Sequence, residues 1–133
     1  MDPRVQAIID LLRTHADQRF TIEELARSVN LSESRLTHLF VQQVGLSPSQ
    51  FFRHVKFERA RYLLQSSFLS IKEIINVVGF NDKSHFAKDF KRIYGFSPTE
   101  YRRRHAVHLK VNGQQIRPTD SNKRQQLGAI LAD

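Results

Sequence analysis

The chain contains two copies of one residue pattern, and this internal repeat limits the possible folds more than any other feature. The matching blocks are FTIEELA and LSIKEII, which begin at residues 20 and 69, and GLSPS and GFSPT, which begin at residues 45 and 95. Ile22 pairs with Ile71 at a shift of 49 residues, whereas Pro48 pairs with Pro98 at a shift of 50. The second copy therefore holds one extra residue, near 81–83. Such a repeat predicts two similar folding units on one polypeptide.

Each copy carries two consecutive stripes of apolar residues at helical spacing. The first stripes are Ile22, Leu25, Ala26 and Val29, and Ile71, Ile74, Ile75 and Val78; the second are Leu36, Leu39, Phe40 and Val44, and Phe86, Phe90, Ile93 and Tyr94. The first helix of each pair spans only about nine residues, too few to be stable alone, so it must pack on the second. The pattern predicts a helix-turn-helix in each copy.

Residues that start and stop helices flank these stripes at matching positions. Capping boxes are expected at Thr21 with Glu24, Ser47 with Gln50, Ser70 with Glu73 and Ser97 with Glu100, and single caps at Ser32 and at Asn81 or Asp82. Gly45 and Gly95 stand where a left-handed C-terminal stop belongs. An earlier helix is predicted after Asp2-Pro3, with Val5, Ile8, Ile9 and Leu12 on its apolar face.

The segment 48–66 is predicted to be one long helix that is apolar on two sides. Phe51, Phe52, Val55, Tyr62 and Leu63 share one broad face, and Phe57, Ala60 and Leu64 lie toward the other. Such a helix is expected to be packed from two sides, which suits a bridge between the two units. Its length of about 28 Å is comparable with the roughly 34 Å of one turn of B-DNA.

These patterns predict an all-α fold of about seven helices, in which two helix-turn-helix lobes are joined by a long central linker helix. The expected divisions are a first lobe at 1–49, the linker helix at 50–66, a second lobe at 67–105 and a C-terminal tail at 106–133. The tail has two interpretations. Alternation of Val107, Leu109 and Val111 before Asn112-Gly113 predicts a hairpin, whereas the lack of a second apolar run favours a loosely ordered polar tail.

The charge balance favours a polyanionic partner. The 133 residues include 21 Lys and Arg against 13 Asp and Glu, a net charge of +8, which suits nucleic acid or an anionic membrane surface. No run approaches the roughly 18 apolar residues needed to span a bilayer, and no segment resembles a signal peptide. The absence of cysteine excludes disulfides and cysteine-based zinc sites. These features are compatible with a cytoplasmic, nucleoid-associated protein.

Double-stranded DNA is the partner that the helix-turn-helix pattern predicts, because the second helix of such a unit lies in the major groove. A helical wheel places small polar and basic residues, together with Val41, on the outward faces of 33–44 and 83–94. The candidates for base contact are Ser34, Arg35, Thr37, His38 and Gln42 in the first copy, and Lys83, Ser84, His85 and Lys88 in the second. Arginine and lysine suit guanine, glutamine suits adenine, and serine or threonine suits several bases.

Contacts to DNA phosphates are expected at helix starts and at nearby basic side chains. The candidates are Thr21, Ser47, Ser70 and Ser97 at helix starts, and Arg53, Lys56, Lys91 and Arg92 among the basic residues. The arginine run at 102–104 could add charge. Each candidate also has a simpler interpretation, as a capping residue or a solvated charge.

No pattern in the chain favours an enzyme, a metal site or a cofactor. The six histidines include no His-Glu-x-x-His motif, and no third ligand accompanies His105 and His108. The serines stand at capping positions, and no glycine-rich phosphate loop occurs. We therefore expect a binding protein without catalytic activity.

Parts of both copies resemble a known family. The blocks SIKEII at 70–75, VGFNDKSHF at 78–86 and FKRIYGFSPTEYR at 90–102 closely resemble the DNA-binding domain of AraC/XylS-type transcription regulators, and LA at 25–26, LS at 31–32 and RARYLL at 59–64 resemble its first half. The likeness covers roughly residues 5–105. It implies two helix-turn-helix lobes that read neighbouring major-groove segments, and transcription activation through contact with RNA polymerase. It also implies an effector-binding or dimerisation domain, which nothing in these 133 residues matches.

The chain departs from the family pattern at three positions. Ile75 stands where the family usually has alanine, as Ala26 does in the first copy. A larger residue there is expected to push the two helices of the second unit apart, unless a neighbour is smaller. His38 and Lys88 stand where arginine is common, which weakens the expectation of bidentate guanine contacts.

Two other functions fit the same residues. An architectural or repressing DNA-binding protein would use the same fold, since fold does not determine the sign of regulation. A protein-interaction module could instead dock its basic face on an acidic partner. A steep salt dependence and a large penalty for base changes would distinguish specific DNA binding from both.

Overall fold

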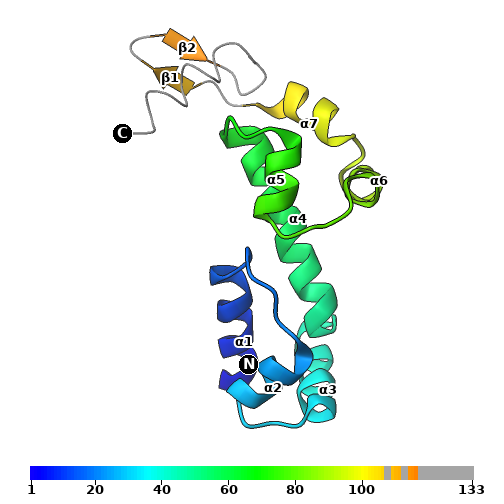
Figure 1. Ribbon diagram of the computed structural model, residues 1–133. Helices are drawn as coiled ribbons and strands as arrows, with labels where there is room; N and C mark the ends of the chain where they lie inside the picture. Colours follow the sequence, from blue (N-terminus) through cyan, green and yellow to red (C-terminus); the bar gives the residue numbers. More distant parts are fainter. Residues whose placement is uncertain (107–108, 112–113, 117–133) are drawn as a thin grey trace. The chain divides into compact units, whose positions relative to one another are not determined.

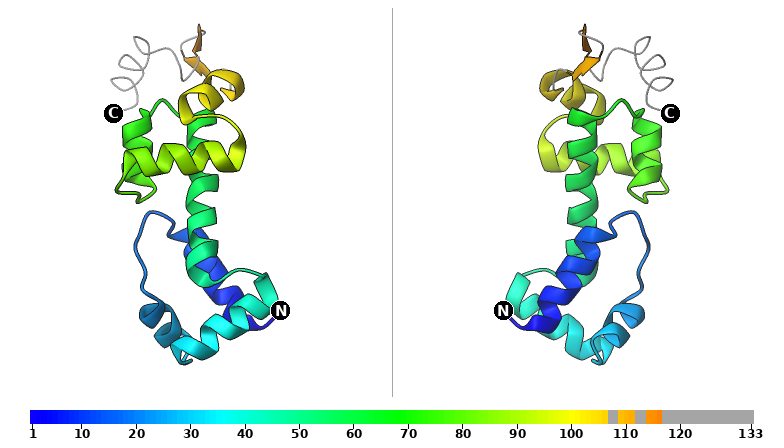
Figure 2. Two further views of the ribbon diagram at one scale, coloured as in Figure 1. Left: turned by 90° about the vertical axis from the view of Figure 1, so that its right-hand side faces the viewer. Right: turned by 90° about the vertical axis from the view of Figure 1, so that its left-hand side faces the viewer.

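The computed structural model describes residues 1–106, 109–111 and 114–116, which form seven helices and a small hairpin (Figure 1; two further views in Figure 2). The elements are α1 (Pro3–Thr14), α2 (Ile22–Ser28), α3 (Glu33–Val44), α4 (Pro48–Ser66), α5 (Ile71–Val77), α6 (Lys83–Tyr94), α7 (Pro98–His105), β1 (Leu109–Val111) and β2 (Gln114–Ile116). The all-α prediction is thus confirmed for the part of the chain that precedes the hairpin.

The helices belong to two compact units, the first ending at Glu58 and the second beginning at Arg59. The division falls inside α4, so that its first half belongs to the first unit and its second half to the second. Each unit therefore includes part of the helix that was predicted to be a linker at 50–66.

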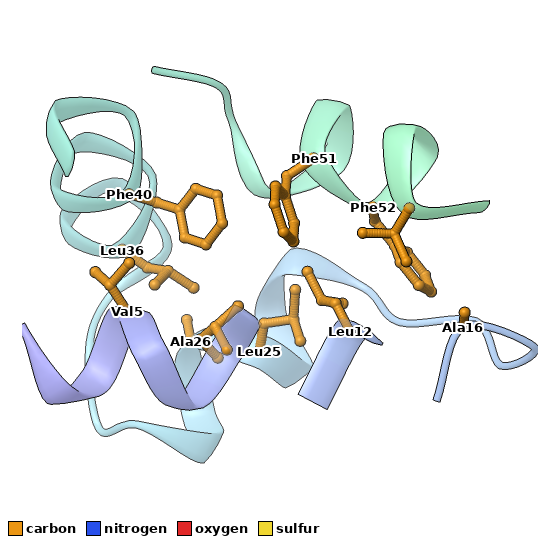
Figure 3. Packing of buried hydrophobic residues seen from close by; sticks show 11 residues of the cluster. Val5, Leu12, Ala16, Leu25, Ala26, Leu36, Phe40, Phe51 and Phe52 are labelled. Atoms are coloured by element: carbon orange, nitrogen blue, oxygen red, sulfur yellow. The ribbon is translucent and has the colours of Figure 1, made fainter. Parts of the chain in front are cut away.

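One cluster of buried apolar side chains holds the first unit together (Figure 3). Its buried members are Val5, Ile8, Leu12, Ala16, Leu25, Ala26, Leu36, Phe40, Phe51, Phe52 and Val55. The rings of Phe40 and Phe51 meet edge to face, with centroids 5.6 Å apart. Burial of side chains of this size contributes about 1.5–3 kcal/mol each, before the loss of conformational entropy is counted.

The second unit buries the corresponding stripes of its own helices. Its buried apolar residues are Ala60, Leu64, Ile74, Ile75, Val78, Phe86, Phe90 and Tyr101. The ring of Phe86 lies between those of Phe80 and Phe90, with centroid separations of 5.1 and 5.8 Å. Aromatic packing therefore extends from the turn that precedes α6 into the middle of that helix.

Two residues predicted to face inward are instead exposed. The side chain of Ile93 is 44% exposed, because the ring of the next residue, Tyr94, occupies the inward position 4.7 Å from Phe90. Tyr62 is 63% exposed. It shares a helix face with Phe51 and Val55, which the first unit buries, but in the second unit α4 buries the face that carries Leu64.

Two short paired strands in the C-terminal tail match the less favoured hairpin interpretation rather than the expected loosely ordered tail. Strands β1 and β2 pair antiparallel, with Leu109 opposite Ile116 and Val111 opposite Gln114. Residues 117–133 lie outside the described part of the chain, so the alternative of a loosely ordered tail stays a prediction for them.

Candidate nucleic-acid interface

The two helix-turn-helix units have the same local geometry. Helices α2 and α5 each contain seven residues, and α3 and α6 each contain twelve. One backbone hydrogen bond closes each turn: the Leu31 N–H donates to the Ala26 carbonyl at 3.0 Å, and the Phe80 N–H donates to the Ile75 carbonyl at 2.9 Å. The larger Ile75 is thus buried without any change in the bond that closes its turn.

Capping residues fix where α3 and α6, here called the recognition helices, begin. The Ser32 hydroxyl accepts a hydrogen bond from the Arg35 N–H at 3.2 Å, and the Asp82 carboxylate accepts one from the His85 N–H at 3.0 Å. Of the two predicted caps for α6, Asp82 is therefore correct, and Asn81 is the extra residue of the second copy. At the other end, Gly45 and Gly95 stop the helices with φ of 88° and 86°.

The residues expected to contact bases lie on the outward faces of the recognition helices. Ser34, Arg35, His38, Gln42, Lys83, Ser84, His85 and Lys88 are exposed, and Thr37 is half-buried. On α3, three of them surround a shallow hollow whose lining residues are Ile22, Glu33, Ser34, Thr37, His38 and Val41. Ser34, Thr37 and His38 are therefore brought together around a concave surface, whereas Arg35 and Gln42 do not line it.

The two recognition helices differ in charge. In α3, Arg35 is balanced by Glu33. In α6, the cationic residues Lys83, Lys88, Lys91 and Arg92 face a single acidic residue, Asp89, which lies 3.3 Å from the Arg92 guanidinium. Phosphate attraction grows with the number of cations that a surface presents. Helix α6 is therefore expected to attract phosphate more strongly than α3.

Two of the helix starts proposed for phosphate contact form reciprocal capping boxes with a glutamate. The Thr21 N–H donates to the Glu24 carboxylate, and the Glu24 N–H donates to the Thr21 hydroxyl, both at 3.1 Å. Ser70 and Glu73 form the same reciprocal box, at 2.9 and 3.1 Å. The N–H and hydroxyl of Thr21 hold the pKa of Glu24 below its usual value, so this carboxylate stays ionised beside the start of α2.

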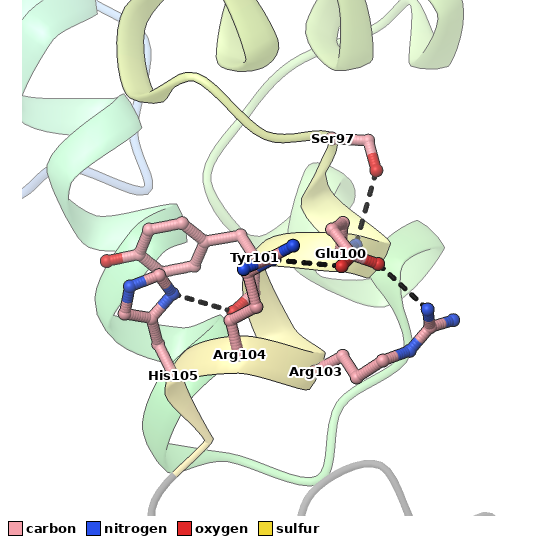
Figure 4. Close-up of polar contacts among 6 residues, drawn as sticks. All are labelled: Ser97, Glu100, Tyr101, Arg103, Arg104 and His105. Carbon is pink, nitrogen blue, oxygen red and sulfur yellow. Dashed lines mark hydrogen bonds and ion pairs between the residues drawn. The ribbon is translucent and has the colours of Figure 1, made fainter.

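The other two starts are capped differently. Ser47 forms its box with the neutral Gln50, through hydrogen bonds of 3.0 and 3.2 Å. Ser97 accepts from the Glu100 N–H at 3.2 Å, and the Glu100 carboxylate binds Arg103 at 2.8 Å and Arg104 at 3.0 Å (Figure 4). The Ser47 box therefore adds no negative charge at its helix start, and two arginines partly neutralise the carboxylate at the start of α7.

Lys56 is largely buried, which disfavours its expected role as a phosphate contact. Its side chain is 8% exposed, and its Nζ donates to the Gln18 carbonyl at 3.4 Å and lies 4.5 Å from the centroid of the Phe52 ring. Burial lowers the pKa of Lys56, and the positive charge of Arg19 acts in the same direction. Arg53, Lys91 and Arg92 are exposed, as expected.

Arg102 is also buried, and its guanidinium caps the end of α4. Its side chain is 6% exposed; Nε donates to the Leu64 carbonyl at 3.0 Å, and Nη2 donates to the Ser67 carbonyl at 3.4 Å. The repeat contains a signal for this position, because a shift of 50 residues pairs Arg102 with the buried Phe52. Only Arg103 and Arg104 of the arginine run are exposed.

Within residues 1–106 and the two strands, no three histidine or acidic side chains are grouped as metal ligands. No helix in this part of the chain has the length and apolar character required to cross a bilayer.

Comparisons with known proteins agree with this geometry. A family model described as "Helix-turn-helix domain" matches residues 25–104. The chain is 38% identical over 103 residues to the arabinose operon regulatory protein of Escherichia coli K12, and 33% identical over 102 residues to the HTH-type transcriptional regulator MtrA of Neisseria gonorrhoeae. Each alignment covers 77% of this chain but only 35% and 34% of the relatives. The chain thus spans about one third of the length of the curated relatives it matches.

A solved structure extends the likeness to three dimensions. The fold is similar to that of a transcriptional regulator from Chromobacterium violaceum, described as an AraC-type DNA-binding domain-containing protein, with a TM-score of 0.74 and 28% identity. The match covers 78% of this chain and 93% of the other.

Proposed function

The chain belongs to the AraC/XylS-type family of helix-turn-helix transcription regulators, and we propose that it reads specific sequences of double-stranded DNA. In this proposal α3 and α6 each enter the major groove, in neighbouring segments of one duplex. The observation that supports it most is the match between the two units: equal helix lengths, equivalent turn-closing bonds and equivalent caps present two exposed polar faces.

Base contacts are assigned to the outward residues of both recognition helices. They are Ser34, Arg35, Thr37, His38 and Gln42 on α3, and Lys83, Ser84, His85 and Lys88 on α6. Phosphate contacts are assigned to Arg53, Lys91 and Arg92, and to the helix starts at Ser47 and Ser97. The start at Thr21 contributes less, because the ionised Glu24 of its own box repels a phosphate, and the start at Ser70 is kept as a candidate.

Regulation of transcription follows from the family, and we favour activation through contact with RNA polymerase. A separate effector-binding or dimerisation domain belongs to the same proposal. The relatives are about three times as long as the matched region, which leaves room for such a domain outside these 133 residues. We further propose that the protein acts in the cytoplasm, on the DNA of the nucleoid, and that it is not an enzyme.

Selection from random double-stranded DNA tests the proposal directly. The purified chain is incubated with the library at about 150 mM salt, which suppresses binding to phosphates alone. Enrichment of two short motifs about one helical turn apart is the expected result. Insertion of about five base pairs between the motifs should then abolish tight binding, because it moves the second motif to the opposite face of the duplex.

Other outcomes of the selection would change the proposal. Enrichment of one motif would mean that a single unit reads sequence. Retention that depends on salt but enriches nothing would favour an architectural role, and no retention at all would favour a protein partner for the basic surface.

A further inference from the structure

The outward face of α3 contains one apolar side chain that stays substantially exposed. Val41 is 43% exposed. It lies one helical turn beyond Thr37 and His38, and it borders the same hollow. A single exposed apolar residue is common on protein surfaces, so the significance of Val41 depends on the residues that surround it.

The hollow beside Val41 combines apolar walls with hydroxyl groups. Val41 comes from α3 and the half-buried Ile22 from the start of α2, so the apolar walls belong to two different helices. Ser34 and Thr37 line the space between them with hydroxyl groups that can donate hydrogen bonds. A ligand group that suits this hollow has a small apolar part next to a hydrogen-bond acceptor.

The charges around the hollow disfavour a phosphate. No lysine or arginine lines it, and the Glu33 side chain does. In the major groove, thymine alone of the four bases carries a methyl group, at C5, beside the O4 acceptor. We propose that this hollow receives the C5-methyl group of a thymine, with Val41 and Ile22 packed against the methyl group and the hydroxyls of Ser34 and Thr37 facing O4. This inference rests on the proposed function as a DNA reader.

The corresponding surface of the second unit lacks most of the residues that would contact a thymine methyl group. The residues at the positions of Glu33, Ser34, Thr37, His38 and Val41 are Lys83, Ser84, Ala87, Lys88 and Lys91. Of the two apolar residues of the hollow, only Ile22 has an apolar counterpart, Ile71. Three lysines replace the carboxylate, the imidazole and the valine, so the corresponding surface of α6 suits anionic or guanine groups. Methyl recognition is therefore assigned to the first unit alone.

Replacement of single thymines by deoxyuridine in the selected DNA provides the test. This change removes the methyl group and leaves O4 in place. Loss of one buried methyl contact should weaken binding by about fourfold at one thymine of the α3 motif. Val41→Ala should reduce the difference in affinity between the thymine and deoxyuridine forms, because only the Ile22 wall still contacts the methyl group. Ile93→Ala is the matched control, because Ile93 is equally exposed but lies outside the hollow, and it should retain the full difference.

The outcomes separate this inference from the function on which it rests. A selected motif that tolerates deoxyuridine at every thymine would overturn the inference and leave sequence-specific binding intact. So would a thymine preference that persists unchanged in Val41→Ala. Failure to select any sequence would overturn both. In a further arm, 5-methylcytosine at the sensitive position should restore part of the affinity that unmethylated cytosine loses, because only the methyl group differs between them.

Discussion

Asn30 and Gly79 occupy the same position in the two helix-turn-helix turns, and both have a left-handed backbone, with φ of 58° and 84°. Each directly precedes the residue whose N–H closes its turn. For most L-residues this conformation costs about 1–2 kcal/mol, whereas glycine adopts it freely and asparagine tolerates it. The angle between the two helices of each unit therefore depends on a residue that contributes little to the core.

Substitution at these two positions should have unequal effects. Gly79→Ala should reduce the free energy of unfolding by about 1 kcal/mol, because alanine resists the left-handed conformation. Asn30→Gly should change it by only a few tenths of a kcal/mol, because the new residue accepts the same angle. Urea denaturation of the three proteins measures both effects. Equal stability of Gly79→Ala and the unsubstituted chain would show that the turn does not hold residue 79 in this conformation.

Local signals in the sequence predicted the helices and their caps well, because such signals act within a few residues. The boxes at Thr21 and Ser70 and the stops at Gly45 and Gly95 are confirmed. The outward faces of the recognition helices also follow from a helical wheel. Such a wheel considers one helix at a time, so it does not show which neighbour covers each side.

The sequence-based predictions of side-chain exposure were wrong where contacts with a neighbouring element determine whether the side chain is buried. Tyr62 shares a face with residues that the first unit buries, yet the second unit leaves it exposed. Lys56 and Arg102 have charged ends that local rules assign to solvent, but both reach backbone carbonyls far away in the sequence. The register of the repeat contained the missing information for Arg102, because its counterpart Phe52 is an apolar core residue.

Arg102 should be important for the stability of the second unit rather than for DNA contact. Arg102→Met keeps an extended apolar side chain but leaves the carbonyls of Leu64 and Ser67 without their donor. We expect a loss of about 1–3 kcal/mol in the free energy of unfolding. Arg103→Met is the matched control: it removes an exposed ion pair with Glu100 and should cost less than about 1 kcal/mol. Similar losses for both variants, measured in urea, would contradict the buried capping role.

The capping box of α2 should make stability depend on pH. Hydrogen bonds from Thr21 lower the pKa of Glu24 in the folded chain, so the folded state binds its proton less readily than the unfolded state does. The resulting stabilisation is complete above the unfolded pKa of about 4.3 and is lost as the pH falls through the lower folded pKa. Thermal denaturation should show Glu24→Gln to be less stable than the original chain at pH 7, with the difference closing in acid.

The box of α4 is the control for that experiment, because its Gln50 carries no charge. Gln50→Ala should lower the melting temperature by the same amount at pH 7 and in acid. A pH-independent effect of Glu24→Gln would mean that the carboxylate contributes only as a hydrogen-bond acceptor.

Three basic residues of the first unit should affect DNA binding in three different ways. Arg35→Ala should reduce discrimination at particular base pairs by about 1–3 kcal/mol, because an exposed arginine on α3 can read guanine. Arg53→Ala should weaken binding to all sequences alike and lower the slope of log K against log salt by about 1, as loss of one phosphate contact does. Lys56→Met should leave that slope unchanged, because its ammonium already donates to the Gln18 carbonyl and lies against the Phe52 ring.

Fluorescence anisotropy with a panel of single-base variants, at several salt concentrations, measures all three effects together. Identical behaviour of Arg35→Ala and Arg53→Ala across the panel would refute the separation of base contacts from phosphate contacts. A lower salt slope in Lys56→Met would mean that Lys56 leaves its buried position when DNA binds. In that case Phe52 would lose the cation beside its ring, and the bound and free forms of the first unit would differ in the packing between α4 and Gln18.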